Sequence, residues 1–246
     1  MSKFAFKTYP QPGTRPDFKA DAARVCDCLL SGGIAIVPTE QGYGLLASDP
    51  AAIERSFAAK QRKHGHPLGI IGNYGLSRQI HILPAERHEM VRVWNQEFDM
   101  SIGVVGPYRH DHPLLTSSLD EETLLKHTKS GTLGMFVGGS PILKEVVNLV
   151  LSKGRLVLGS SANLTGTGQK FRVEDVEDAV KDAVDIIIDY GLQRAHVYGV
   201  GSMNIDFENL KVLRFGSCYE MFRDYMSRFW DVELPEGPPV PCVPTQ

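Results

Sequence analysis

Short apolar runs alternate with amphipathic segments along most of this chain, and this alternation is the feature that most restricts its fold. The apolar runs have the length and composition of buried strands, and they lie at 33–38, 67–73, 101–106, 131–137 and 155–159. The amphipathic segments have helical spacing, and they lie at 17–33, 49–62, 83–96 and 141–154. Strands separated by helices predict an α/β domain in which helices cover a sheet.

The last third of the chain continues this pattern. We expect a helix at 172–180, a strand at 184–191, a strand pair at 197–206 and 210–216, and an amphipathic helix at 219–230. A proline-rich tail follows that helix. Because no repeat or linker divides the sequence, we predict one α/β domain with a mixed sheet at 17–216. Residues 217–246 then form a C-terminal helix and tail that pack on the domain or trail from it.

Composition excludes several classes of protein. The 246 residues carry a formal net charge of −3, so nucleic acid would have to bind at a local basic patch. No run approaches the roughly 18 apolar residues of a membrane span, and the first residues lack the apolar core of a secretory signal. The four cysteines do not have zinc-site spacing, so we expect reduced thiols in a cytoplasmic protein that has no membrane partner.

The stretch LVLGSSANLTG at 156–166 begins as a buried strand and then becomes small and polar. Its Ser160, Ser161 and Asn163 are typical of turns, because such residues bond their own backbone or tolerate a positive φ. The same hydroxyls, amide and unhindered N–H groups also suit a phosphate. On this segment alone, a plain turn and an anion site both remain open.

A basic cluster, AAKQRKHGHPLG at 58–69, follows a predicted helix. Lys60 and Arg62 are two residues apart, so a continuing helix would direct them to different sides. A glycine and a proline end the helix here and leave both side chains to converge in a loop. Basic residues at a helix end can simply complement the helix dipole. Together with the stretch at 156–166, however, they predict a nucleoside triphosphate site, and without a GxxxxGK[ST] motif it is not of the Walker type.

Four sequence blocks resemble the YrdC-like family and occur in its order. IVPTEQGYGL, a helix and then KQR resemble the pattern P-T-D/E-T-x-Y-G-L, helix, K-x-R. GSSANLTG is similar to S-A-N-x-S/T-G, and IIIDYG, GSMNID and LKVLRFG resemble the closing D-G-G, S-T-V-V-D and L-R-x-G strands. The blocks extend over 17–216, which is most of the chain.

This resemblance implies a twisted mixed α/β sheet with a basic concave cavity and an ATP-dependent activity. Members of the family include threonylcarbamoyl-AMP synthases, which combine ATP, bicarbonate and L-threonine, and relatives that transfer carbamoyl groups through carbamoyl-adenylates. By position, the resemblance assigns the catalytic nucleotide site to Lys60, Arg62, Ser161 and Asn163. Thr132 and Arg214 match further nucleotide-binding positions, and Mg²⁺ is expected to bridge the phosphates.

The chain departs from the family pattern where members contact the amino acid. Gln41 stands in place of the usual Thr, Ile71 in place of a His, and Phe136 in place of an Arg. The predicted substrate-binding residues are Thr39, Gln41, Phe136 and Ser202. Phe136 makes this wall of the site apolar, so a carboxylate would find no hydrogen-bond partner there. We therefore predict an enzyme that forms a carbamoyl- or acyl-adenylate, with or without bicarbonate. Its partner is a small amino acid or carboxylate other than free threonine.

Two histidine pairs raise the alternative of a metal site. His64 with His66 and His110 with His112 lack a third ligand of diagnostic spacing, so we predict no metal bound by protein side chains. His66 fits better as a phosphate or ribose contact, because it ends the K-x-R loop. A second function also stays open, a non-catalytic module that binds RNA or a nucleotide. The lack of an aromatic and basic stripe weighs against RNA, and the sequence leaves the oligomeric state open.

Overall fold

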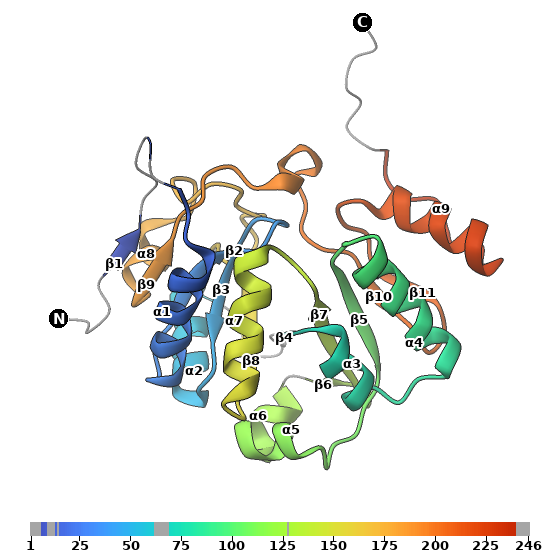
Figure 1. The fold of residues 1–246 in the computed structure, drawn as a ribbon, viewed down its shortest axis with the longest axis horizontal. Coiled ribbons are helices and arrows are strands. Elements are labelled where there is room, and N and C mark those ends of the chain that lie inside the picture. The colour runs from blue at the N-terminus through green and yellow to red at the C-terminus, as the bar shows by residue number, and fades with distance from the viewer. Residues whose placement is uncertain (1–5, 9–12, 14, 62–68, 127, 240–246) are drawn as a thin grey trace, which may run out of the picture.

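The structure, a computed structural model, describes residues 6–8, 13, 15–61, 69–126 and 128–239. Its helices lie on both faces of one twisted mixed sheet (Figure 1), which confirms the predicted α/β fold. The strands follow the order β1-β9-β2-β3-β8-β4-β7-β5-β10-β11, and β6 pairs with β7 beside them. The strands are β1 (Phe6–Thr8), β2 (Ala35–Pro38), β3 (Tyr43–Ala47), β4 (Gly69–Gly72), β5 (Ile102–Pro107), β6 (Thr128–Lys129), β7 (Thr132–Val137), β8 (Val157–Ser161), β9 (Ile186–Ile188), β10 (Asn204–Asp206) and β11 (Lys211–Arg214).

Several helices, among them α2 and α7, begin where the sequence supplies a capping side chain. Asp49 accepts a hydrogen bond from Ala51 N (2.9 Å) and precedes a proline at the first helical position of α2. Ser140 caps α7 in the same way and also donates to the Pro38 carbonyl (2.6 Å), which ties α7 to the end of β2. The helices are α1 (Phe18–Leu30), α2 (Pro50–Ala59), α3 (Tyr74–Ile80), α4 (Ala85–Arg92), the π-helix η1 (Val93–Glu97), α5 (Pro113–Ser118), α6 (Glu121–Lys126), α7 (Pro141–Ser152), α8 (Asp178–Asp182), the 3₁₀-helix η2 (Arg194–Tyr198) and α9 (Tyr219–Trp230).

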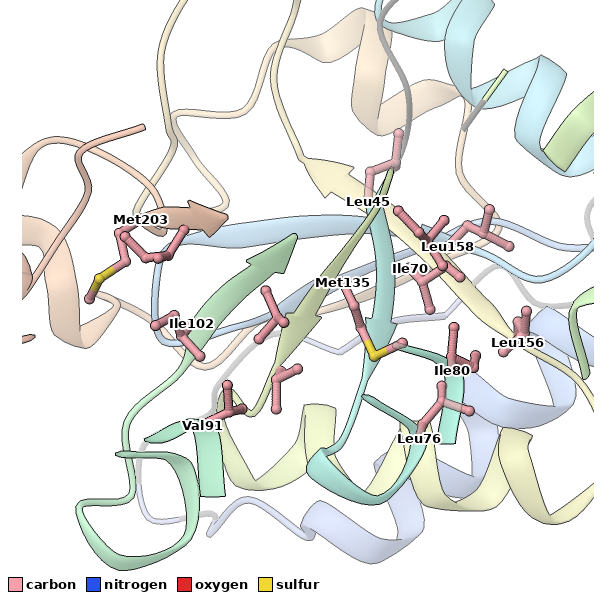
Figure 2. Close-up of a cluster of buried hydrophobic side chains, with 14 of the residues drawn as sticks. Leu45, Ile70, Leu76, Ile80, Val91, Ile102, Met135, Leu156, Leu158 and Met203 are labelled. Atoms are coloured by element: carbon pink, nitrogen blue, oxygen red, sulfur yellow. The ribbon is translucent and has the colours of Figure 1, made fainter. Parts of the chain in front are cut away.

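Two apolar layers hold the helices on the sheet. On one face, α1 and α7 pack together over β2, β8 and β9, because their apolar residues recur at helical spacing. On the other face, Ile70 and Met135 of the neighbouring strands β4 and β7 and Leu45 of β3 belong to one buried cluster with Leu76 and Ile80 of α3 (Figure 2). Among the described helices, none combines the length and the apolar character needed to cross a membrane.

Several expected elements differ from the structure. The helix expected at 172–180 is wrong over most of its length, because α8 covers only Asp178–Asp182. The strand expected at 197–206 is also wrong in its first half, where η2 ends and Gly199 adopts a left-handed conformation. Strand β3 and helix α3 have no counterpart among the predicted elements. All five residues of β3 are buried, so the segment lacks the alternation that marks a half-exposed strand.

Candidate functional site

The polar stretch at and after the end of β8 lies between the first residues of β3 and β4, the two strands that flank β8. Ser161 pairs with Gly44 of β3, and Gly159 pairs with Gly69 of β4. Immediately beyond the strand, Ala162 N donates to the Tyr43 carbonyl (2.8 Å). The stretch therefore turns over the start of β3, beside the loop that joins β2 to β3.

Lys60 joins the end of α2 to this stretch. Its ammonium donates to the Ser161 carbonyl, to the Asn163 carbonyl (2.7 Å) and to Asn163 Oδ1 (3.4 Å). In return, the Lys60 carbonyl accepts from Thr165 N (3.0 Å) and Thr165 Oγ1 (3.0 Å). Lys60 is 3% exposed and Asn163 is 5% exposed, so the bonds are buried. Two segments about 100 residues apart thus form one unit, which we call the Lys60 clasp (Lys60 with residues 161–165).

Arg62 and His66 lie outside the described residues, although both are predicted site residues. The described chain stops at residue 61, one residue after Lys60, and resumes at residue 69 with the start of β4. Both ends of the gap therefore adjoin the stretch after β8, because Lys60 bonds to it and Gly69 pairs with it.

Glu177 holds the far end of the same loop, and no motif in the sequence pointed to it. Its carboxylate accepts from Leu164 N (3.1 Å) and Thr167 Oγ1 (2.6 Å), and it pairs with Lys170 Nζ (2.9 Å). Burial raises the pKa of this carboxyl, but these hydrogen bonds outweigh it and lower the pKa to about 2. The same bonds explain why the expected helix starts late, because Glu177 anchors the loop instead of continuing a helix.

Replacing Glu177 with glutamine should lower the free energy of unfolding at neutral pH by roughly 1–3 kcal/mol. A depressed pKa contributes stability that is complete above the unfolded value of 4.5 and is lost as the pH falls toward 2. Urea unfolding of wild type and Glu177→Gln at pH 7, 5 and 3 measures the difference, which should shrink as the pH falls. Asp178→Asn, next to it on an exposed side chain, is the matched control. An equal difference at all three values would contradict the assigned pKa.

The loop between β2 and β3, which we call the hairpin (residues 39–42), lies beside the stretch after β8. Thr39 closes it through Oγ1, which donates to the Gly42 carbonyl (2.8 Å). Gly42 has φ of +122°, and a Cβ there would lie 2.1 Å from the Gln169 amide, so only glycine fits. Gln169 in turn donates to the Tyr43 carbonyl (3.2 Å), which joins the hairpin to the loop after β8.

The Gln41 side chain, predicted to contact the substrate, bonds to two serines of the protein. It is 5% exposed. Its amide nitrogen donates to Ser101 Oγ (2.9 Å), and its amide oxygen accepts from the Ser217 hydroxyl. Both polar atoms are therefore hydrogen-bonded inside the protein.

Phe136 lies partly buried at the C-terminal end of β7, opposite Ile71 of the parallel strand β4. A Cβ on Gly139 would lie 3.2 Å from the Phe136 ring and 3.3 Å from the Thr39 carbonyl oxygen, so the ring lies near the hairpin. Phe136 is thus an apolar wall beside the hairpin, and Ile71 lies next to it, 8% exposed in the apolar layer under α1 and α7. Thr132 begins the same strand four residues earlier, where its hydroxyl donates to the Lys129 carbonyl (2.7 Å), so it does not share this wall.

Arg214 and Ser202, predicted for the nucleotide and the substrate respectively, are brought together. Arg214 donates to the Ser202 carbonyl (2.9 Å) and to Ser202 Oγ (3.0 Å). A Cβ on the preceding residue, Gly201, would lie 3.2 Å from Gln169 Oε1. This places the 201–202 segment beside the loop after β8, with the Arg214 guanidinium holding its backbone.

Tyr43, which follows the hairpin, is fully buried and part of a polar network that the sequence patterns did not show. Its hydroxyl donates to Asp189 Oδ1 (2.9 Å) and accepts from Tyr190 N (3.0 Å). Burial, followed by the nearby Asp189 charge, raises the pKa of Tyr43 well above its ordinary value. The phenol therefore stays neutral, and it anchors the hairpin to the end of β9.

Within the described residues, no three His, Cys, Asp or Glu side chains gather where they could hold a metal ion. The His64 and His66 pair lies outside those residues.

Comparison with solved structures places the same fold in several proteins. The hypothetical protein smu.1377c from Streptococcus mutans UA159 is 20% identical, with a TM-score of 0.66 over 82% of this chain and 89% of its own. P. abyssi Sua5 complexed with L-threonine is 23% identical, with a TM-score of 0.63 over 82% of this chain. Full-length HypF in a phosphate- and nucleotide-bound form is 16% identical, with a TM-score of 0.54 over 77% of this chain. This chain spans 56% of the Sua5 chain and 26% of the HypF chain.

A search of curated proteins finds no match for the chain. The family model for Sua5, YciO and YrdC, described as telomere recombination, matches residues 27–216. The match covers the hairpin, the Lys60 clasp and the Arg214 segment together. The chain therefore belongs to the Sua5/YciO/YrdC family.

Proposed function

We propose that this protein is an ATP-dependent enzyme that forms a carbamoyl- or acyl-adenylate from a small amino acid or carboxylate. The Lys60 clasp carries the proposal, because it brings the start of the K-x-R segment onto the S-x-N segment. Those are the two segments that the family pattern assigns to the nucleotide. The backbone carbonyls of residues 161 and 163 are turned toward Lys60, which fixes the orientation of the loop between them.

The proposed reaction needs alignment of two anions more than a protein nucleophile. An oxygen of the carboxylate or carbamate attacks the α-phosphorus of ATP, the new O–P bond forms, and the bond to pyrophosphate breaks. The enzyme lowers the barrier by holding both anions in line and by stabilising the charge that grows on the phosphate oxygens. Arg62 can donate two parallel hydrogen bonds to a phosphate, and the loop at 159–166 supplies hydroxyl and amide donors.

Mg²⁺ fits this site as an ion held by the ligand. Mg²⁺ keeps several waters and binds substrate phosphates through few protein oxygens. The described residues agree with that mode, because the Glu177 oxygens beside the loop are used by Thr167, Lys170 and Leu164. When bound, the ion would neutralise phosphate charge while the protein orients the phosphates.

The partner proposed for ATP is not free threonine. Phe136 presents the carbon atoms of its ring beside the hairpin, and the side chain next to it on β4 is the apolar Ile71. A buried carboxylate placed there without a partner would lose its hydration with no hydrogen bond in return. An uncharged or apolar portion of the partner suits this wall better.

Exchange of labelled pyrophosphate into ATP tests the proposed activity directly. Exchange should appear only when the correct carboxylate, or an amino acid with bicarbonate, accompanies ATP and Mg²⁺. A panel of amino acids and small carboxylates identifies the partner. If the protein binds ATP or RNA and no member of the panel supports exchange, the non-catalytic alternative replaces this proposal.

Replacing Arg62 with alanine should weaken ATP–Mg²⁺ binding by about 1–3 kcal/mol, the worth of hydrogen bonds to a charged group. Isothermal titration calorimetry of wild type and variant measures the change. Arg55→Ala is the matched control, because Arg55 lies on α2 with its side chain 53% exposed and pairs with Asp185 at 3.9 Å. Equal affinity for ATP–Mg²⁺ in Arg62→Ala and wild type would show that the phosphates do not bind at the segment that contains Arg62.

A further inference from the structure

The first residue after the family match contacts the hairpin (residues 39–42). The matched segment ends at residue 216. The next residue, Ser217, is fully buried and donates through its hydroxyl to Gln41 Oε1, and also to the Gly201 carbonyl (3.2 Å). A Cβ on Gly216 would lie 2.1 Å from Met203 N, so this crossing is as close as a backbone allows. The position of Ser217 relative to the hairpin is therefore fixed.

Helix α9 anchors this crossing from the other side. Phe222 and Met226 are fully buried, and the Phe222 ring packs edge-on against Trp94 with centroids 5.0 Å apart. Tyr225 donates its hydroxyl to the Met90 carbonyl at the end of α4 (2.9 Å). Figure 1 shows α9 beside α4 and β11, away from α1 and α7. The helix is thus built into the domain, and Ser217 connects it to the hairpin.

Gln41 is the side chain that meets this connection. It donates to Ser101 and accepts from Ser217, while Ser101 donates to Glu40 Oε1 (2.8 Å). A threonine, the usual family residue here, has one hydroxyl on Cβ. The glutamine amide extends two carbons further and offers a donor and an acceptor at once. Only a residue of that reach and chemistry bonds to both serines.

The hairpin needs such support because its backbone is strained. Glu40 has φ of +69°, a left-handed conformation that a residue with a side chain adopts only when its surroundings hold it. Its carbonyl accepts from Ala195 N (3.0 Å), and its carboxylate lies 3.6 Å from the Arg194 guanidinium. Together with Ser101 and Ser217, these contacts surround a loop of four residues with segments from three distant parts of the chain.

We propose that Gln41 is a positioning residue that couples the C-terminal element (residues 217–239) to the hairpin and so sets the hairpin's conformation beside the candidate site. The replacement of the usual threonine is then a structural adaptation to the C-terminal element of this chain. In this role Gln41 does not contact the substrate. Docking of α9 orients Ser217, Ser217 orients the Gln41 amide, and the amide orients Thr39 and Glu40.

Hydrogen exchange of the full chain without ligand tests the coupling. Two hairpin amides and the amide that follows the hairpin report on it, because Thr39, Glu40 and Tyr43 donate to Gly42, Gln193 and Lys170 respectively. Ser217→Ala should raise their exchange rates by about tenfold, the effect expected for one lost buried hydrogen bond. Ser48→Ala is the matched control. It removes a buried serine hydrogen bond to the Leu156 carbonyl (2.6 Å) at the end of β3 that lies away from the hairpin, and it should raise exchange near residues 48 and 156 only.

A double-variant cycle distinguishes coupling from general loosening. Gln41→Leu keeps much of the side-chain volume and removes both bonds, so adding Ser217→Ala to it should change hairpin exchange by less than about twofold. Additive effects, or unchanged hairpin exchange in Ser217→Ala, would overturn the proposal. If Ser217→Ala does not fold, Gln41→Leu against Ser48→Ala makes the same comparison. Hairpin exchange in Ser48→Ala as fast as in Gln41→Leu would also overturn the proposal.

The enzymatic consequence rests on the proposed function and is measured separately. In pyrophosphate exchange, Ser217→Ala should raise the KM for the partner several-fold and leave kcat within about twofold, because a misplaced hairpin weakens binding more than the phosphoryl chemistry. A wild-type protein without exchange activity would sink the proposed function while leaving the hydrogen-exchange result intact. If Gln41→Leu changes which partner is preferred and Ser217→Ala does not, Gln41 contacts the substrate directly and the positioning role is wrong.

Discussion

Lys60→Met is expected to reduce pyrophosphate exchange by roughly 100-fold, an effect on the scale of removing one preorganised donor from a reaction centre. The buried ammonium donates to the carbonyls of Ser161 and Asn163. Methionine fills a similar volume but removes the ammonium donor from both oxygens, and among the described residues only the Ser161 carbonyl keeps another donor, Asn163 N (3.1 Å). The free energy of unfolding should therefore fall by about 2–5 kcal/mol. The exchange assay and urea unfolding measure the two effects independently.

The manner of the loss shows how Lys60 acts. If Lys60 holds the loop, amide exchange at Asn163 and Thr165 rises together with the loss of ATP affinity, because Thr165 N donates to the Lys60 carbonyl (3.0 Å). A cation that only binds phosphate would lower affinity and leave loop exchange unchanged. Lys144→Met, which removes an exposed ion pair with Asp99, is the matched control and should leave both measurements as in wild type. Full pyrophosphate exchange in Lys60→Met would show that the Lys60 clasp is not part of the reaction site.

The unit formed by Lys60 and the loop was predictable in outline from the sequence. Two segments, each of little specificity alone, together predict a shared site, and the structure brings them into contact through Lys60. What the sequence did not show is the direction of the Lys60 ammonium. The ammonium points at backbone carbonyls. The identities of the residues in a loop do not show which way its carbonyls are directed. Alternation and spacing record which side chains are apolar, but not where main-chain oxygens point.

Glu177 and Gln41 illustrate a second limit. Glu177 reads as part of a helix because its neighbours have helical spacing, yet its carboxylate bonds to a loop 13 residues earlier. The family pattern predicts a substrate contact at Gln41, and it does not include the bond from Gln41 to a serine 176 residues away. Both roles depend on tertiary partners far along the chain, and local pattern arguments do not include them. By contrast, α9 and β7 depend on local periodicity and begin and end close to the expected residues.

Free L-threonine should have a kcat/KM at least roughly tenfold below that of the preferred partner, because a site lacking a group's polar partners gains little from that group. Phe136 presents its ring beside the Thr39 carbonyl, and Ile71 is its neighbour across β4 and β7. Phe136→Arg introduces a guanidinium where the family pattern has one. It should raise threonine-dependent pyrophosphate release by about tenfold, consistent with one hydrogen bond to a carboxylate.

The control for this gain is a second arginine at an exposed phenylalanine. Phe229→Arg places the same charge near the end of α9, where the side chain is 65% exposed, and it should leave threonine use unchanged. Both variants change the net charge equally, so general attraction of an anionic substrate cancels between them. A wild-type protein that prefers threonine at sub-millimolar concentration would contradict the substrate difference. In that case the apolar wall would have to lie away from the carboxylate, and a cation elsewhere in the site would bind it.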